Sequence, residues 1–368
     1  LPAGAAGAIV SLADYAGTWQ TNALTVSPNG SEKIGSVNAD VVLNTEGQSV
    51  TFVYVDGTQG WINTMDSTSN AIGNPNLTAT GGTITTSGDY KIHTFTGPGT
   101  FTVTNASSTA ANNIVSYLVV AGGASGGSSE GGGGGAGGFR EYKGPADSYT
   151  ASPLNGNPCG TAITVTAQAY PITVGAGGAS RPSSPSQNGA PGSNSVFSTI
   201  TSAGGGGGGS NASPGNALSG GSGGGSRRDN NSPTAAAGNT PPVTPPQGNN
   251  GGSTPTCNWQ GGGGGGGATA VGGNGSGNAS PGGEVGGPGG AGATTSITAS
   301  PVAYAGGGGG SINGTSGNIG TGGTGGGGNG SQPPACATAG TVNTGGGGGG
   351  GAGKASGGGG SGIVIIRY

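Results

Sequence analysis

Uninterrupted runs of glycine break up this chain from residue 131 onward. Glycine loses more backbone entropy on ordering than any other residue, so a fold that keeps such runs ordered must hydrogen-bond their peptide groups unusually completely. The runs are therefore either disordered or packed in a regular backbone lattice. The longest are Gly131–Gly135, Gly204–Gly209, Gly261–Gly267, Gly306–Gly310, Gly325–Gly328, Gly345–Gly351 and Gly357–Gly360.

The lattice alternative has a definite geometry, the polyglycine II helix. This is an extended threefold helix of the polyproline type, with about 3.1 Å rise per residue, so a seven-glycine run spans roughly 22 Å. Its N–H and C=O groups point outward, to neighbouring helices. Each hydrogen bond contributes only about 1 kcal/mol net, so many rods are needed to offset the ordering entropy. Collagen is excluded, because runs such as Gly261–Gly267 break the Gly-X-Y period.

The composition does not suit a conventional globular enzyme. Only 30% of the 368 residues are hydrophobic and 6% are charged, so the core cannot consist mainly of apolar side chains. A net charge of −3 with scattered Lys and Arg gives no electrostatic footprint for nucleic acid. The sequence has no apolar stretch long enough for membrane insertion and no signal peptide. Its first residue, Leu1, is compatible with a processed or trimmed N-terminus.

Residues 1–66 are predicted to form a small β module for attachment or oligomerisation. The turn sequences Pro28-Asn29-Gly30 and Asp56-Gly57 fit its connections. Its aromatic residues Trp19, Phe52, Tyr54 and Trp61 are expected to pack in a core rather than to form a sugar-binding platform. The Ser-, Thr- and Asn-rich residues 67–87 are predicted to be a linker. The predicted strands are Ala23–Val26, Asp40–Leu43, Ser49–Val55 and Gly60–Asn63.

The second domain, residues 88–368, is expected to be closed at its base by strands. Tyr90–Phe95 and Thr100–Val103 are predicted to form a hairpin, followed by a strand at Ile114–Val120. The apolar run Ile363–Ile366 is typical of a buried strand, and we expect it to meet Ile114–Val120. The predicted fold class is therefore all-β plus polyglycine II, with a small β module followed by packed polyglycine II helices closed by β-strands.

Strand-like segments precede three of the glycine runs, and a long interruption separates two others. The segments are Ser195–Ala203, Ile297–Ala305 and Thr341–Thr344. The interruption, Asn211–Gln260, contains Arg227, Arg228, two Pro-Pro pairs and Trp259. We predict that it forms display loops on a scaffold.

The sequence lacks the usual residues for catalysis. Its single histidine, His93, lies in a predicted strand, which disfavours nucleophilic triads and histidine metal sites. Matches to Gly-x-Gly-x-x-Gly arise trivially from poly-glycine and have no βαβ context. We therefore expect a non-enzymatic protein with no cofactor and no metal. Between Gly144 and Gly353 the charged residues are Asp147, Arg181, Arg227, Arg228, Asp229 and Glu284, and none suits a pair for acid–base catalysis.

Three cysteines, Cys159, Cys257 and Cys336, lie in Pro-, Asn- and Thr-rich segments between the glycine blocks and are expected in exposed loops. A disulfide between Cys257 and Cys336 would join neighbouring loops in an oxidising setting and leave Cys159 free. The alternative is that all three thiols are unpaired.

Several segments resemble the glycine-rich domain found in tail fibres and adhesins of tailed phages. Residues 88–95 (GDYKIHTF), 99–103 (GTFTV) and 117–123 (YLVVAGG) resemble its beginning, and residues 360–368 (GSGIVIIRY) resemble its end. The resemblance covers residues 88–368. Residues 24–35 (LTVSPNGSEKIG), with 52–57 (FVYVDG) and Gly60-Trp61, are similar to a short β module of fibre-like virion proteins, notably of marine phages.

The resemblance implies a receptor-binding fibre or spike on the virion surface. In the related adhesins the glycine helices form a sandwich whose distal loops contact an outer-membrane protein or glycan of the host. Other virion structural proteins are implied as partners, and a homotrimer would suit a fibre. Aromatic and arginine side chains dominate binding interfaces. The candidate receptor contacts are accordingly Tyr149, Arg181, Arg227, Arg228 and Trp259.

Two other classes compete with the adhesin hypothesis. The chain could be a structural or decoration protein of the capsid or tail, or a subunit of a cell-surface filament, whose loops bind nothing in particular. A tailspike that degrades polysaccharide is disfavoured by the scarcity of carboxylates between Gly144 and Gly353.

Overall fold

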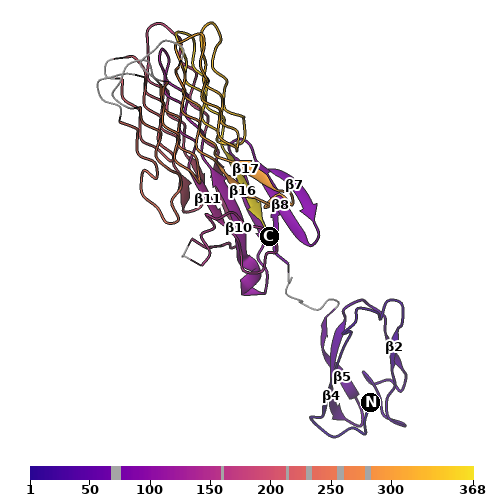
Figure 1. The fold of residues 1–368 in the computed structure, drawn as a ribbon. Helices are drawn as coiled ribbons and strands as arrows, with labels where there is room; N and C mark the ends of the chain where they lie inside the picture. Colours follow the sequence, from indigo (N-terminus) through magenta and orange to yellow (C-terminus); the bar gives the residue numbers. More distant parts are fainter. Residues whose placement is uncertain (68–75, 159–160, 213–214, 229–233, 255–260, 278–282) are drawn as a thin grey trace. The chain divides into compact units, whose positions relative to one another are not determined.

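The protein consists of two compact units, Leu1–Gly73 and Asn74–Tyr368, each of which is described separately. A computed structural model describes residues 1–67, 76–158, 161–212, 215–228, 234–254, 261–277 and 283–368 (Figure 1). Across these residues the regular structure consists of β-strands and one short 3-10 turn, Ala110–Asn113, with no α-helix.

The first unit is a small antiparallel β structure. Its main sheet has the order β1-β4-β5, and β2 pairs with β3. Trp61 and Phe52 are almost completely buried in its core, as the sequence predicts. The Asp56 carboxylate accepts the N–H groups of Thr58 and Gln59, which fixes the predicted hairpin turn. The strands are β1 (Ile9–Ala13), β2 (Leu24–Val26), β3 (Val41–Leu43), β4 (Ser49–Asp56) and β5 (Gly60–Ser67); β1 was not predicted.

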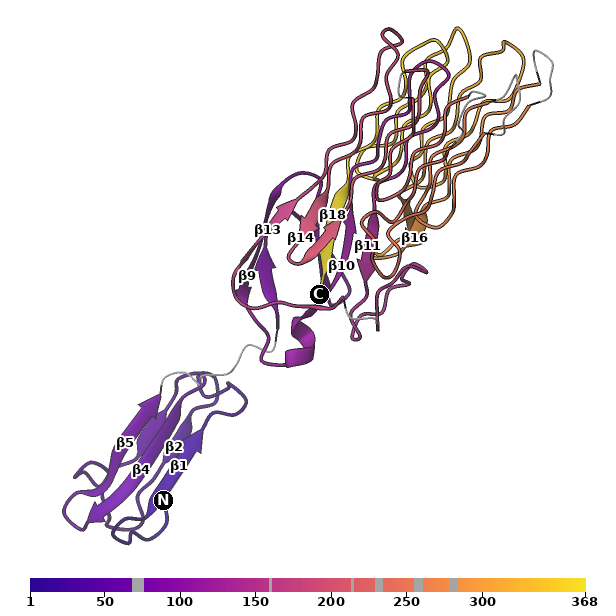
Figure 2. The same ribbon diagram turned by 90° about the vertical axis from the view of Figure 1, so that its left-hand side faces the viewer.

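The base of the second unit is a pair of packed antiparallel sheets (Figure 2). Phe101 and Phe197 from one sheet and Tyr117 and Val364 from the other share one apolar cluster. One sheet has the order β11-β10-β18-β8-β7, with β12 beside β10, and the other β15-β14-β13-β9-β6. Their strands are β6 (Thr78–Thr80), β7 (Thr83–Ser87), β8 (Tyr90–Phe95), β9 (Gly99–Asn105), β10 (Ile114–Val120), β11 (Phe139–Tyr142), β12 (Ile163–Thr164), β13 (Ala169–Thr173), β14 (Ser195–Phe197), β15 (Ile200–Ser202) and β18 (Ile363–Arg367).

Strands β10 and β18 are buried on both faces. In β10, Tyr117 faces the cluster between the sheets, whereas Leu118 faces a second cluster on the other side. That second cluster also receives Ile297 and Tyr304, from the hairpin formed by β16 (Ala293–Thr295) and β17 (Val302–Tyr304). Burial on both faces explains why the two sequences are continuously apolar. The prediction that they meet is confirmed, because β10 and β18 pair antiparallel.

Two sequence predictions near the start of this unit are wrong. Residues 78–87, assigned to the linker, form β6 and β7. Their Thr-rich sequence shows no apolar alternation, because β7 is exposed and needs no apolar side chains. The predicted hairpin between Tyr90–Phe95 and Thr100–Val103 does not form: β8 pairs with β7 and β18, whereas β9 pairs with β6 and β13. The Gly97-Pro98 connection instead passes from one sheet to the other.

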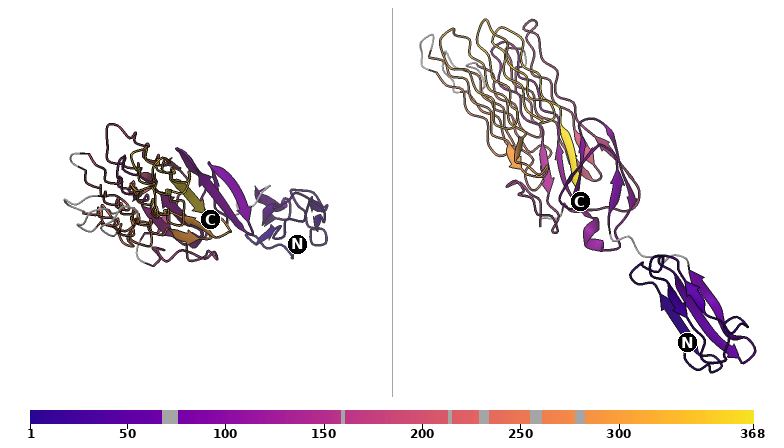
Figure 3. Two further views of the ribbon diagram at one scale, coloured as in Figure 1. Left: turned by 45° about the horizontal axis from the view of Figure 1, so that its top comes forward. Right: turned by 90° about the vertical axis from the view of Figure 1, so that its right-hand side faces the viewer.

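The glycine runs form long rods that lie side by side and extend from the base strands (Figure 3). Along residues 131–138, successive N–H groups donate to three neighbouring rods in turn, and every third donor returns to the same rod. The N···O distances in this set are 2.8 to 3.0 Å. The first neighbour accepts at Gly351, Gly348 and Gly345, the second at Gly209, Gly206 and Ala203, and the third at Gly263 and Gly266.

The same three-residue period recurs in residues 261–268. Gly261, Gly264 and Gly267 donate to Ser276, Gly273 and Ala270, and the intervening residues donate to two other rods. Where the residue numbers of the acceptors decrease as those of the donors increase, the neighbouring rod is antiparallel. Where they increase, as from Gly263 to Gly266, the neighbouring rod is parallel. The bundle therefore mixes both directions and satisfies its backbone without a conventional sheet.

Close packing of the rods leaves no room for side chains at their centre. A Cβ atom added to Gly265 would fall on the carbonyl oxygen of Gly134, and one added to Gly133 would fall on that of Gly308. Gly97, in the base connection, would place a Cβ with nothing within 4 Å. Glycine is thus required in the rods because backbones approach each other closely, not because a turn demands it.

Substituting Gly265 tests this steric requirement. We expect Gly265→Ala to lower the unfolding free energy of the second unit by about 1–3 kcal/mol, because rods must separate to admit the methyl group. Gly97→Ala serves as the matched control and should change it by less than about 1 kcal/mol. Denaturant titration of both variants measures the difference. Equal stabilities would contradict tight rod packing.

Candidate functional site

The rods of the second unit are joined by turns at the end opposite the base strands (Figure 1). We call residues 128–130, 181–186, 210–212, 226–228, 312–317, 331–337 and 351–356 the tip turns. Hydrogen bonds link neighbouring turns: the Ser129 hydroxyl donates to the Ser183 carbonyl at 3.1 Å, and the Asn211 amide donates to the Ser129 carbonyl at 3.1 Å. The tip is therefore a connected surface built from segments far apart in sequence.

The predicted display loops are much shorter than the sequence suggested. Residues 220–226 are buried in the bundle, and Gly223 and Gly225 donate to Asn249 and Gly133. Residues 215–226, 234–238 and 247–254 are thus largely rods, whereas residues 240–246, which contain both Pro-Pro pairs, form a mostly exposed turn. The prediction that all of Asn211–Gln260 is a loop is wrong, because glycines interspersed with Ser, Ala and Asn also join the lattice.

Three candidate contacts lie in the tip turns, and one does not. Arg181, Arg227 and Arg228 are each half-buried there, and Trp259 lies outside the described residues. Tyr149 is only 6% exposed and packs near the base in the second apolar cluster. Its hydroxyl donates to Glu141 at 3.1 Å, and burial, followed by the Glu141 charge, raises its pKa. Tyr149 is therefore a core residue, and its assignment as a receptor contact is corrected.

Arg228 joins three tip segments through carboxylates. Its guanidinium lies 3.7 Å from Glu130 and 3.5 Å from Glu284. Glu284 is fully buried, and its other oxygen accepts the N–H groups of Asn313 and Gly314. A buried carboxylate needs such partners, so this arrangement fixes the shape of the tip.

Arg227 and Arg181 are held differently. The Arg227 Nη1 donates to the carbonyls of Ser210 and Ala212 at 3.3 and 3.4 Å, which braces the adjacent turn. Arg181 pairs with Ser356 through its main chain, with N···Oγ and O···N distances of 3.0 Å. Its side chain is therefore not what holds the turn in place.

Cys336 is exposed in the tip turns and carries a free thiol. It borders an open hollow of about 710 Å³, whose lining also includes Asn318, Ser331 and Gln332. Cys257, the predicted disulfide partner, and Cys159 lie outside the described residues. Cys336 thus offers a chemical handle on the tip surface.

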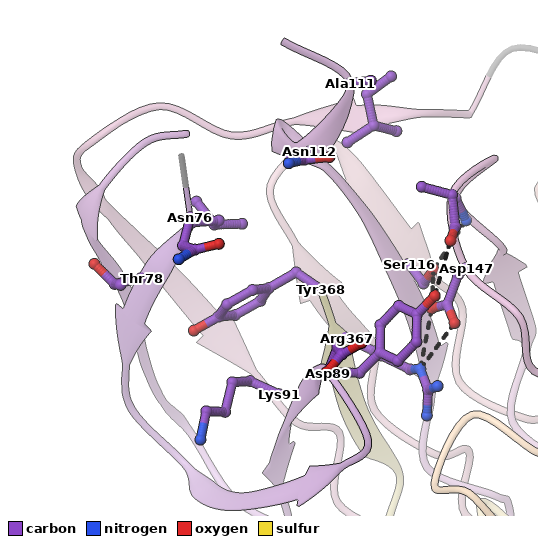
Figure 4. A pocket seen from close by; sticks show the side chains of 15 residues that line it. Asn76, Thr78, Asp89, Lys91, Ala111, Asn112, Ser116, Asp147, Arg367 and Tyr368 are labelled. Carbon is purple, nitrogen blue, oxygen red and sulfur yellow. Dashed lines mark hydrogen bonds and ion pairs between the residues drawn. The ribbon is translucent and has the colours of Figure 1, made fainter. Parts of the chain in front are cut away.

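A second hollow, of about 660 Å³, lies at the base beside the C-terminal strand (Figure 4). The Arg367 Nε contacts both Asp147 oxygens at 3.0 and 3.1 Å, and its guanidinium lies 4.3 Å from the Tyr90 ring centre. The Ser116 hydroxyl donates to Asp147 at 2.8 Å. These buried polar groups partner one another, so the pair joins β18 to the loop after β11 rather than awaiting a substrate.

In the described part of the chain, no group of three or more His, Cys, Asp or Glu residues is placed to hold a metal ion. No helix among the described residues is long and apolar enough to cross a membrane.

The family comparison covers the rods and most of their base. Residues 94–368, about three quarters of the chain, match the model of the glycine-rich domain. The chain belongs to the glycine-rich domain family. The match begins within β8 and ends at the last residue, so it takes in the whole tip and leaves the first unit outside. No curated protein matches the chain.

The buried ring of His93, one residue before the matched region, connects the two base sheets of the second unit. The His93 Nδ1 lies 2.7 Å from the Gly81 carbonyl, and Nε2 lies 3.2 Å from the Tyr368 hydroxyl. A carbonyl can only accept, so Nδ1 carries the proton and Nε2 accepts from Tyr368 in the neutral ring. The Tyr368 hydroxyl in turn accepts the Ala79 N–H at 2.9 Å. Burial lowers the pKa of His93 below its ordinary value of 6.5.

This pKa predicts the pH dependence of stability. Below pH 6.5 the unfolded chain binds a proton on His93 that the folded protein resists. The unfolding free energy should therefore decrease as the pH is lowered, by at most about 1.4 kcal/mol per pH unit, until the pKa of His93 in the folded protein is reached. Denaturant titrations between about pH 7.5 and 5 measure the slope. His93→Gln should flatten it, and an unchanged slope would show that other groups cause the dependence.

Proposed function

We propose that this protein is a fibre or spike on the surface of a phage virion, and that its tip turns bind a receptor on the host cell, an outer-membrane protein or a glycan. The observation that carries the proposal is the segregation of side chains. Rod positions such as Gly133 and Gly265 exclude a Cβ, whereas the tip turns carry long charged side chains, those of Arg181, Arg227, Arg228 and Lys354. A stiff bundle that displays short turns at one end is suited to recognition.

The rods of the bundle are proposed to be polyglycine II helices. Support comes from the return of every third N–H to the same neighbouring rod, as in residues 131–138 and 261–268. A threefold helix of the polyproline type points successive residues in three directions, which gives this period. The threefold helix is compatible with both parallel and antiparallel neighbours. Each hydrogen bond involves one N–H of one rod and one carbonyl of the next, so it does not depend on the relative direction of the two chains.

The first unit is proposed to attach the protein to other virion structural proteins, in a homotrimer. Support comes from its position before the glycine-rich domain and from its resemblance to modules of fibre-like proteins. On this proposal the protein is non-enzymatic, uses no cofactor and contacts neither nucleic acid nor the membrane interior. The competing candidate, a structural or decoration protein or a filament subunit, predicts a tip that binds nothing.

Blocking the tip chemically separates these candidates. Purified chain should compete with virions for adsorption to host cells. In a Cys159→Ser, Cys257→Ser background, coupling a polyethylene-glycol maleimide to the exposed Cys336 should abolish this competition, because the polymer covers the tip turns. Competition is measured as the fraction of virions left unadsorbed.

The matched control carries the same polymer at the base of the second unit. Cys336→Ser combined with Ser148→Cys places it on an exposed residue of the loop after β11, and competition should persist. Equal loss from both positions would contradict tip recognition, and no competition by the unlabelled chain would favour the structural alternative. Release of reducing sugars from host envelope glycans would contradict the non-enzymatic assignment.

A further inference from the structure

Two cations in neighbouring tip turns have no partner in the described part of the chain. Arg181 makes no side-chain hydrogen bond or ion pair there, and its Nε is buried without an acceptor. Lys354 is exposed and likewise lacks an ion pair among the described residues. The main-chain bonds between Arg181 and Ser356 place the two turns side by side, with Lys354 two residues before Ser356.

The side chains of the other two tip arginines, in contrast, have partners within the protein. Arg228 has Glu130 and Glu284, and Arg227 has two carbonyl acceptors. The first unit, in contrast, is strongly acidic. The first unit has one basic residue, Lys33, against the acidic residues Asp14, Glu32, Asp40, Glu46, Asp56 and Asp66.

We propose that Arg181 and Lys354 form a subsite for an anionic group, a carboxylate or a sulfate, on an acidic polysaccharide. This inference rests on the proposed receptor-binding function and specifies its ligand. A guanidinium presents a planar fork of donors that fits either anion, and an adjacent ammonium adds a flexible point charge. The hydroxyl group of Ser183, two residues after Arg181, suits the hydrogen bonding of sugar rings.

The surroundings favour a polysaccharide over a protein. Protein interfaces have a core of aromatic and apolar side chains. Among the described residues the large exposed hydrophobics lie mainly in the first unit and on the sides and base of the second, and Val285 is the one beside the tip turns. A polar, cationic surface gives a ligand little apolar area, so charge must supply much of the recognition.

The test measures binding of the full chain to immobilised polyanions. The probes are polygalacturonate for carboxylate and dextran sulfate for sulfate, with neutral dextran as the blank. Binding to at least one polyanion should exceed that to dextran and weaken as salt rises. The variant R181Q/K354Q should bind that polyanion at least fivefold more weakly. Glutamine keeps the main-chain bonds between Arg181 and Ser356, so the turns should stay in place.

The control variant K91Q/K143Q removes the same charge near the base, from an exposed and a half-buried lysine. It should bind the polyanions as the parent chain does. Equal weakening in both variants would overturn the subsite, because attraction would then depend on net charge alone. Absence of binding to both polyanions would overturn it as well.

Virion adsorption distinguishes this inference from the function on which it rests. If polymer at Cys336 blocks competition but R181Q/K354Q competes normally, the tip binds a receptor through other residues, and the anion subsite is wrong. If the polymer has no effect, the receptor-binding proposal itself fails. If the polymer and R181Q/K354Q each abolish competition while K91Q/K143Q does not, both the receptor-binding proposal and the anion subsite are supported.

Discussion

The close approach of backbone to backbone between glycine rods is the constraint on which this structure depends. Each rod donates to three neighbours in turn, and the acceptor carbonyls occupy the space that a Cβ would need. The interior of the bundle is therefore held mainly by peptide groups, and side chains buried within the rods, such as those of Ala124, Ser125 and Ser222, are small. The chain can be long, weakly hydrophobic and sparsely charged because this unit does not depend on an apolar core along its whole length.

Magnitudes show why the rods need the base. Fixing the backbone of one residue costs about 1–2 kcal/mol, whereas one hydrogen bond contributes about 1 kcal/mol net. A rod with one donated bond per residue does not offset its own ordering. The apolar clusters around β10 and β18 supply conventional stabilisation, and these strands flank the first and last rods directly. Pairing of β10 with β18 thus fixes the position of both ends of the bundle.

Features that follow from the local composition could be predicted from the sequence. Features that depend on which strand pairs with which could not. The apolar runs of β10 and β18 have one stable location, between two apolar layers, so their meeting was predictable. The Thr-rich β7 looked like a linker because an exposed strand has no apolar periodicity. Gly97-Pro98-Gly99 looked like a hairpin turn because local sequence does not reveal which sheet each flanking strand joins.

The tip illustrates the same limit for function. Arginine composition selected Arg181, Arg227 and Arg228 alike, yet only their neighbours separate a braced arginine from an unpartnered one. Arg228 is paired with Glu130 and Glu284, which are distant in sequence. Tyr149 was chosen because aromatic side chains dominate interfaces, and its burial depends on Glu141 and on the β16–β17 hairpin. No local pattern carries that information.

Buried serines mark where the lattice gives way to the tip. Rods end toward the tip at serines that are almost fully buried: Ser128, Ser210, Ser226, Ser311 and Ser331. The Ser311 hydroxyl donates to the Gly131 carbonyl at 2.8 Å, and that of Ser331 donates to Gly350 at 3.3 Å. Each of these carbonyls also accepts the main-chain N–H of the same serine, at 3.1 and 3.0 Å, so the hydroxyl adds a second donor to an oxygen at the end of the rod. Because the last buried carbonyls are served within the rods, a change of sequence in the turns beyond would not leave the lattice backbone unpaired.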